Sequence, residues 1–196
     1  MSSNEIRGRV LLGITGSVGA KDSVKLIELL CAKHEVQVVA STSSLAFFDL
    51  ASAQCRAKVH TDEDDWYTWR QRGDRILHIS LRNWADLFVI APMTANTLGK
   101  LAGGICDNLL TTVFRAWQLG VKPLMVAPSM NKFMWEHPAT ETHLARLQSW
   151  NVCVIPPREK WLAGGDFGPA AMAKPEGIAE SVGHILSANR TAAQTP

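Results

Sequence analysis

The sequence has no long apolar run, no cluster of basic side chains and no visible targeting segment. Its longest apolar stretches are shorter than the roughly 20 residues that a membrane-spanning helix needs, and no signal peptide is recognisable. The formal net charge is only +2, whereas a nucleic-acid interface would need a basic patch. We therefore expect a cytoplasmic protein that has neither a membrane nor a nucleic acid as its partner.

Cysteine is also scarce, and the four cysteines of the chain are scattered. Cys31, Cys55, Cys106 and Cys153 form no Cys-x-x-Cys pair and no cysteine–histidine pattern with zinc-ligand spacing. A secreted disulfide framework or a zinc site would need closer and more regular spacing. The pattern therefore predicts no metal ion and favours a reducing compartment.

The residues that are present suit one soluble domain. The chain has 196 residues, of which 46% are hydrophobic and 19% are charged, and this length is enough to bury a sizeable core. We expect an N-terminal tail at residues 1–7, one domain over residues 8–187 and a disordered tail over residues 188–196.

Short apolar runs alternate with helical segments along the chain, which is typical of an α/β protein with a parallel sheet. The runs expected to form strands are residues 9–15, 36–40, 85–90, 122–127 and 152–155. A final helix is expected over residues 176–186. Residues 156–169 are rich in glycine and proline and are expected to form a mobile flap.

The segment Ala91-Pro-Met-Thr-Ala-Asn-Thr97 follows one of these strands and precedes a helix. Ligands bind at such turns on the carboxyl edge of a parallel sheet. Its hydroxyl and amide side chains offer donors and acceptors, and its alanines leave room for a flat ring to approach the backbone. For an isolated match, Thr94 as a simple helix N-cap would be the better interpretation.

Two other strand ends carry small polar residues. Gly16-Ser17-Val18 stands between a strand and a helix, where free N–H groups and the helix dipole suit a phosphate. The glycine spacing is not that of a dinucleotide fingerprint, so a mononucleotide is favoured. Four consecutive hydroxyls, Ser41–Ser44, could complete the phosphate cradle. The alternatives are a tight turn capped by Ser17 and a solvated turn at Ser41–Ser44.

An acidic run, Asp62–Asp65, precedes a helix expected over residues 75–84. We interpret its carboxylates as the first turn of a helix with a solvated face, and Trp66 and Trp69 as core or as a subunit contact. His78 lies four residues before Arg82, so both project to one side of the later helix. A lone histidine is more often structural than catalytic.

Asn131 is flanked by Met130, Met134 and Trp135 after the strand at residues 122–127. An amide in such apolar, polarizable surroundings could fix a carboxylate while excluding water. The alternative is a methionine-rich patch between subunits. Upstream, Asp107 is expected to cap a helix over residues 109–117.

Taken together, these motifs resemble those of the flavin-containing cysteine decarboxylases, and most closely the single-domain, eukaryote-type phosphopantothenoylcysteine decarboxylases. The resemblance extends from about Gly8 to Ile185. The motifs that carry it are Gly16-Ser-Val18, His78, Ala91–Thr97, Gly104-Ile-Cys-Asp-Asn108 and Pro128-Ser-Met-Asn-Lys-Phe-Met-Trp135. It implies a Rossmann-like, doubly wound, three-layer α/β domain that binds FMN. It also implies homotrimers, or a dodecamer built of trimers, with the flavin at a subunit interface.

The resemblance also implies residue roles. His78 matches the catalytic histidine. Asn131 matches the asparagine that holds the substrate carboxylate, and Met134 is expected beside it in the substrate site. The positions that match FMN contacts are Gly16, Ser17, Val18, Ser43, Thr94, Ala95, Asn96, Thr97 and Ala127.

One departure from the family pattern lies in the flap. The phosphopantothenoylcysteine enzymes have Cys-Gly-Asp there, whereas this chain has Gly164-Gly165-Asp166, and none of its cysteines falls in the flap. In those enzymes the cysteine serves the last step, in which reduced flavin returns a hydride and a saturated thiol forms. The cysteine would donate a proton in this step, and a glycine has no side-chain proton to donate.

The leading hypothesis is therefore an FMN-dependent oxidative decarboxylase that converts a cysteine carboxylate to an enethiol, as the members acting on the C-terminal cysteine of a peptide do. One alternative is phosphopantothenoylcysteine decarboxylation in coenzyme A biosynthesis, with a partner subunit supplying the missing cysteine. Another is a non-catalytic flavoprotein subunit that regulates a phosphatase.

Overall fold

The computed structural model describes residues 7–68, 70–161, 164–165 and 167–193. Its centre is a six-stranded sheet with the strand order β3-β2-β1-β4-β5-β6, in which every neighbouring pair is parallel. The strands are β1 (Arg9–Ile14), β2 (Glu35–Ala40), β3 (Lys58–Thr61), β4 (Leu87–Met93), β5 (Leu124–Pro128) and β6 (Cys153–Val154). This order confirms the predicted doubly wound, Rossmann-like fold.

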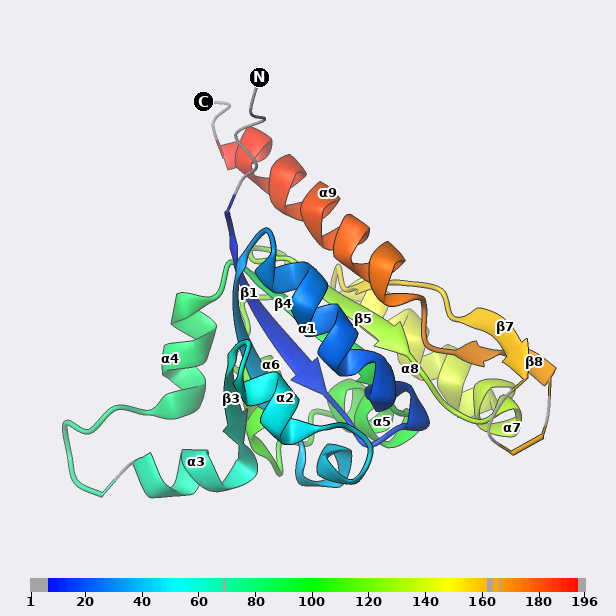
Figure 1. Cartoon of the computed structure of the whole chain (residues 1–196), viewed down its shortest axis with the longest axis horizontal. Helices are drawn as coiled ribbons and strands as arrows, with labels where there is room; N and C mark the ends of the chain where they lie inside the picture. Colours follow the sequence, from blue (N-terminus) through cyan, green and yellow to red (C-terminus); the bar gives the residue numbers. More distant parts are fainter. Residues whose placement is uncertain (1–6, 69, 162–163, 166, 194–196) are drawn as a thin grey trace.

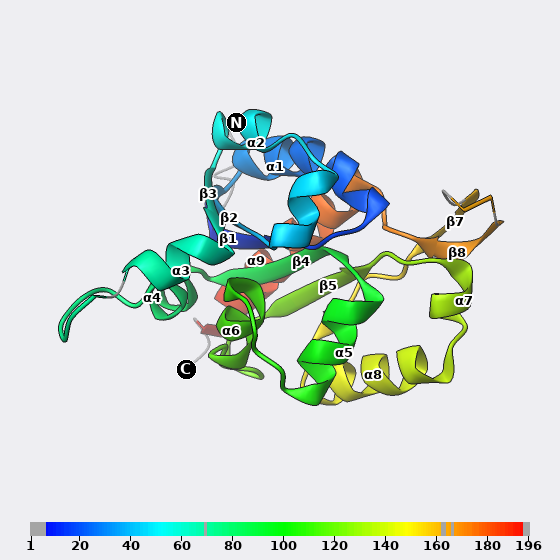
Figure 2. The same cartoon turned by 90° about the horizontal axis from the view of Figure 1, so that it is seen from below.

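Helices cover both faces of the sheet (Figures 1 and 2). One core cluster joins the sheet to α1 (Ser23–Cys31), α2 (Leu50–Gln54) and α9 (Pro175–Ala193). A second cluster joins the other face to α4 (Leu77–Trp84), α5 (Ala95–Gly103), α6 (Leu109–Arg115) and α8 (Pro138–Ser149). All residues of β4 and β5 are buried, as expected for central strands covered on both faces.

Two parts of the sheet structure were not predicted. The edge strand β3 has only four residues, and His60 alone among them is fully buried, so it has no apolar pattern to reveal it. The expected flap contains a two-stranded antiparallel hairpin of β7 (Arg158–Trp161) and β8 (Phe167–Ala171). Its tip includes Gly164 and Gly165, while residues 162, 163 and 166 lie outside the described part.

Several predicted boundaries and caps need correction. Helix α9 continues to Ala193, although disorder was expected from residue 188, because the alanine-rich end of the chain has no glycine or proline before Pro196 to stop it. Helix α6 is capped by Asn108 rather than by Asp107, since Asn108 shares a capping box with Thr111. Asp107 forms an ion pair with Lys100 instead.

Within the described ranges, no helix is long and apolar enough to cross a membrane, and no group of three or more His, Cys, Asp or Glu side chains could hold a metal ion.

The starts of β1 and β4 are joined by an ion pair. Asp86 accepts hydrogen bonds from the backbone N–H of Arg9 and from its Nη2, both at 2.9 Å. Partial burial disfavours the charged carboxylate, but the hydrogen bonds and charge of Arg9 outweigh it, so the pKa of Asp86 is lowered. A carboxylate with a lowered pKa stabilises the fold above its unfolded-state pKa, and this stabilisation is lost as pH falls through the folded-state value.

We therefore expect Asp86→Asn to lower the free energy of unfolding by about 1 kcal/mol at pH 7, a value reduced for solvent screening. The difference from the wild type should shrink below about pH 4, where the unfolded-state carboxyl becomes protonated. Urea titrations at several pH values would measure both effects. Glu28→Gln is the control, because the Lys25–Glu28 pair is exposed; a deficit in Asp86→Asn that does not depend on pH would contradict this account.

Candidate active site

A cavity of about 610 Å³ lies at the carboxyl ends of the central strands. It is bordered by the turns after β1, β2, β4 and β5 and by the β7–β8 hairpin. The predicted site residues that line it are Gly16, Ser17, Val18, Ser43, Thr94, Ala95, Asn96, Asn131 and Met134. Three other predicted residues, Thr97, Ala127 and His78, are not part of its lining.

The turn after β1 leads first into a short 3₁₀ helix, η1 (Val18–Asp22), and only then into α1. Ser17 caps η1 by accepting a hydrogen bond from the Gly19 N–H at 3.2 Å, and its hydroxyl lies 2.8 Å from that of Ser129. The expected capping role is therefore correct, and the same residue still lines the cavity.

Gly16 brings this turn against the hydroxyl-rich turn after β2. A Cβ atom at position 16 would lie 2.6 Å from the Ser43 hydroxyl oxygen and 2.7 Å from the Ser43 carbonyl oxygen. No side chain fits in that space, so glycine is required for the two turns to meet.

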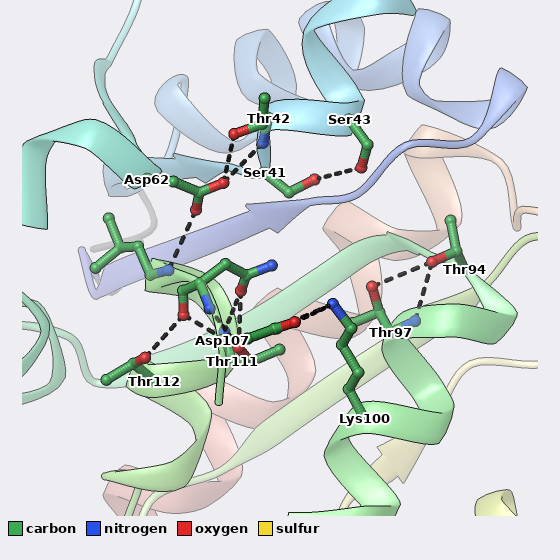
Figure 3. A network of polar contacts seen from close by, with 12 residues as sticks. Ser41, Thr42, Ser43, Asp62, Thr94, Thr97, Lys100, Asp107, Thr111 and Thr112 are labelled. Atoms are coloured by element: carbon green, nitrogen blue, oxygen red, sulfur yellow. Dashed lines mark hydrogen bonds and ion pairs between the residues drawn. The ribbon is translucent and has the colours of Figure 1, made fainter. Parts of the chain in front are cut away.

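The four hydroxyls of the second turn have different roles, and Figure 3 shows those of Ser41, Thr42 and Ser43. Ser44 is fully buried and donates to the Ser41 carbonyl oxygen, whereas Ser43 lines the cavity. Thr42 donates to Asp62 Oδ2 from its N–H at 2.9 Å and from its hydroxyl at 2.7 Å. The turn, which forms η2 (Thr42–Ala46), is thus held by specific bonds and is not simply a solvated turn.

The acidic run is also more than a solvated helix face. It begins α3 (Asp62–Thr68). Asp62 Oδ1 accepts from the Leu109 N–H at 3.2 Å, so this carboxylate joins η2 to the first residue of α6 (Figure 3). Asp65 accepts from His78. Trp66 is 79% exposed, which excludes it from the core, and Trp69 lies outside the described residues.

Thr94 caps α5, as the simpler interpretation predicted, and also lines the cavity. Its side chain accepts from the Thr97 N–H and donates to the Thr97 hydroxyl at 3.1 Å. Thr97 therefore holds the Thr94 side chain in place without lining the cavity itself. Ala127 is fully buried in β5 and belongs to the core.

Asn131 caps the short helix α7 (Lys132–Trp135) through a 2.9 Å bond from the Phe133 N–H to its Oδ1. The preceding residue is tied to the hairpin, because the Met130 N–H donates to the Ala170 carbonyl oxygen. Met134 is 55% exposed and lines the cavity beside Asn131. The polar amide and the apolar thioether thus border the same space.

His78 lies away from this cavity, on α4. Figures 1 and 2 place α4 at the opposite end of the molecule from α7 and the β7–β8 hairpin. The His78 Nδ1 atom is 3.1 Å from Asp65 Oδ1. A single chain therefore does not bring the two predicted catalytic residues, His78 and Asn131, together.

The hairpin contributes cavity residues that the sequence patterns did not reveal. Arg158, Lys160 and Trp161 line the cavity together with Lys21 and Asp22 of η1. Arg158 donates to the Met172 carbonyl oxygen at 2.9 Å and lies 3.9 Å from Asp22. Strand β7 has only four residues. A segment this short has too few alternating positions to predict from the sequence which of its faces points into the cavity.

Gly164 also lines the cavity and is exposed. The four cysteines are free: Cys31 is half-buried and the others are exposed, and none of them is part of this lining. Burial raises the pKa of the Cys31 thiol, which keeps it protonated. The cavity therefore contains no thiol of its own chain.

The lining suits the phosphate and ring of a flavin mononucleotide. Gly16 and Gly19 line the cavity with backbone alone. A Cβ at either position would lie under 3.0 Å from a serine side chain, so a larger residue does not fit there. Hydroxyls of Ser17 and Ser43 offer hydrogen-bonding groups around that backbone.

Comparisons with known proteins identify the family and support a flavin cofactor. The family model described as Flavoprotein matches residues 1–187. The phosphopantothenoylcysteine decarboxylase of Arabidopsis thaliana is 50% identical over 174 residues, which cover 89% of this chain and 83% of the relative. The corresponding enzyme of Mus musculus is 44% identical over 185 residues, covering 94% and 90%.

Solved structures are similar over most of their length. A cysteine-to-serine mutant of a PPC decarboxylase, in complex with pantothenoylaminoethenethiol, superposes with a TM-score of 0.90 at 48% identity, covering 93% of this chain and 100% of that one. The FMN-binding protein AtHal3 gives 0.87 at 48%, covering 93% and 98%. The epidermin biosynthesis protein EpiD from Staphylococcus aureus gives 0.75 at 29%, covering 88% and 99%.

The close approach at Gly16 provides a test of the cofactor position. We expect Gly16→Ala to reduce the FMN that co-purifies with the protein by at least about tenfold, because the new methyl group displaces Ser43 from the cavity. Absorbance of the purified protein near the flavin bands measures the bound fraction. Gly99→Ala is the matched control, since its Cβ would have only ordinary contact with His143; normal flavin content in Gly16→Ala would contradict the placement.

Proposed function

The chain belongs to the Flavoprotein family and is a flavin-dependent decarboxylase of a cysteine-containing substrate, and from this premise we propose that its substrate is phosphopantothenoylcysteine. The Arabidopsis thaliana and Mus musculus relatives, which carry this activity in their names, are 50% and 44% identical. The similarity to EpiD, at 29%, is weaker. This favours the coenzyme A alternative over the peptide substrate that was our leading hypothesis.

The charge of the cavity is the observation that carries this choice. Among the described residues, Lys21, Arg158 and Lys160 line it, and Asp22 supplies their one carboxylate. A substrate with both a carboxylate and a phosphate suits such a surface, because each anionic group gains from a nearby cation in a partly enclosed site. A peptide without charged side chains would not need these cations beyond the one that binds its terminal carboxylate.

Each residue then has a definite task. When bound, FMN supplies the oxidant that converts the cysteine side chain into an electron sink for the loss of carbon dioxide. Asn131 orients the carboxylate, and Met134 keeps water away from it. His78 takes the proton of the substrate thiol.

This division of tasks requires more than one chain, because His78 lies away from its own cavity. We infer a homotrimer, or a dodecamer of trimers, in which a neighbouring copy supplies the histidine. The surface around His78 suits such a contact, since Trp66, Ile76 and Ile79 are all exposed there at 79%, 44% and 38%.

Gly164 determines the product. Without a thiol at the flap, the chain has no group there to deliver the last proton, so the reaction ends at the enethiol, and dissolved dioxygen would have to reoxidise the reduced flavin before the next turnover. A relative with one cysteine changed to serine was captured in complex with an aminoethenethiol, which is this type of product. A saturated thiol would then require a second, cysteine-bearing subunit.

The absence of a thiol at Gly164 is also compatible with two other functions. Release of an enethiol would suit a peptide-modifying enzyme, and a silent site would suit a regulatory flavoprotein. Turnover of a peptide ending in cysteine but not of phosphopantothenoylcysteine would favour the first. The absence of any turnover would favour the second.

Product mass tests the proposal directly. We expect the purified protein to convert phosphopantothenoylcysteine to a product lighter by about 46 Da, because two hydrogens leave with carbon dioxide. Gly164→Cys should yield some product lighter by only about 44 Da, since the restored thiol can deliver a proton. A loss of about 44 Da with the wild-type protein alone would contradict the assigned role of Gly164.

Mixed assemblies test the shared site. We expect His78→Asn and Asn131→Asp each to abolish turnover. In trimers that contain both variants we expect about a third of wild-type activity, because one of the three sites in each such trimer would combine an intact His78 with an intact Asn131 from the neighbour. Differently tagged copies, co-produced and purified through both tags, give the mixture. Mixed assemblies as inactive as the parents would contradict a site shared between copies.

A further inference from the structure

The side chain of His78 is held by a single acidic partner. Its Nδ1 lies 3.1 Å from Oδ1 and 3.2 Å from Oδ2 of Asp65, so both carboxylate oxygens face the same ring nitrogen. Asp65 Oδ1 also lies 3.4 Å from the His78 backbone N–H, as its acceptor. The two side chains are only 25% and 17% exposed.

The helix turn that carries Asp65 is held in place by its neighbours in the acidic run. Asp62 bonds Thr42 and the first N–H of α6, and Asp64 accepts from the N–H and hydroxyl of Thr61 at 2.7 and 3.2 Å. These bonds hold the first turn of α3 at both ends, so Asp65 is directed at α4 before any substrate arrives. The short helix α4 is anchored by its buried Leu77 and Leu81.

We propose that Asp65 is a positioning residue for the decarboxylation, and that it acts by fixing the tautomer and direction of the His78 ring. This inference rests on the proposed function of His78. A carboxylate accepts hydrogen bonds only, so the Nδ1 beside it must carry the proton. In the neutral ring Nε2 is then the unprotonated nitrogen, and it has no hydrogen-bond partner in the described part of the chain.

This arrangement prepares His78 as a base. An unprotonated Nε2 can accept the proton of a substrate thiol, and Asp65 stabilises the imidazolium that results. Without the carboxylate, the neutral ring would be free to adopt the other tautomer, in which Nε2 carries a proton and cannot accept one. Asparagine can present its NH₂ group to Nδ1, which would favour that unproductive tautomer.

The experiment combines turnover with a direct measurement of the tautomer. In the flavin-loaded protein labelled with ¹⁵N-histidine, long-range ¹H–¹⁵N spectra should show an unprotonated Nε2 for His78, assigned by the loss of its signals in His78→Asn. We expect Asp65→Asn to move His78 toward the other tautomer and to lower kcat for phosphopantothenoylcysteine by about 10- to 100-fold. KM and FMN content should change little, and Asp65→Glu should recover part of the activity.

Glu63→Gln is the matched control, because it removes the same charge from an exposed position on the same helix and should leave kcat and the His78 spectrum unchanged. An unaltered kcat in Asp65→Asn, or a wild-type His78 that carries its proton on Nε2, would overturn the proposal. If phosphopantothenoylcysteine is not the substrate, the wild type will not turn it over, and the spectrum alone then decides the role of Asp65.

Discussion

Burial of β1, β4 and β5 on both faces confines the polar chemistry of the sheet to the turns that follow these strands. β4 and β5 are buried throughout, and only the first residue of β1 is exposed. The turns at their carboxyl ends meet at the point where the strand order reverses between β1 and β4. The close approach of Gly16 to Ser43 then decides how near the turn after β1 can come to the turn after β2.

This constraint explains why much of the site could be predicted from sequence. Apolar runs long enough to be central strands are recognisable, and the polar residues directly after them belong to the same edge of the sheet. Ser17 and Thr94 were each open to two interpretations, as caps or as ligands; both cap helices, and both also line the cavity in which the flavin is expected. A capping hydroxyl at a strand end lies beside the free N–H groups that also make such a place suitable for an anion.

The features that were missed depend on contacts distant in sequence. β3 is an edge strand without an apolar pattern, and the hairpin residues that line the cavity reach it only because β8 packs on α7. The roles of Asp62 and Asp65 were missed for the same reason, since their partners are 20 to 47 and 13 residues away. Four adjacent acids are typical of a solvated helix start, and no local pattern distinguishes the ones whose partners lie far away in the sequence.

The α3 helix therefore links two surfaces that would otherwise be independent. On one side Asp62 fixes the turn that carries Ser43, a residue of the cavity in its own chain. Three residues later Asp65 fixes His78, which must serve a cavity in another chain if the proposed assembly is correct. Residues three apart on a helix lie close together on its surface, so a shift of α3 would disturb the flavin side of one site and the histidine of the next. This gives a physical reason for the acidic run to be short and held by several bonds. The run sets the distance between Ser43, which lines the cavity of its own chain, and His78, which is proposed to act in the cavity of a neighbouring copy.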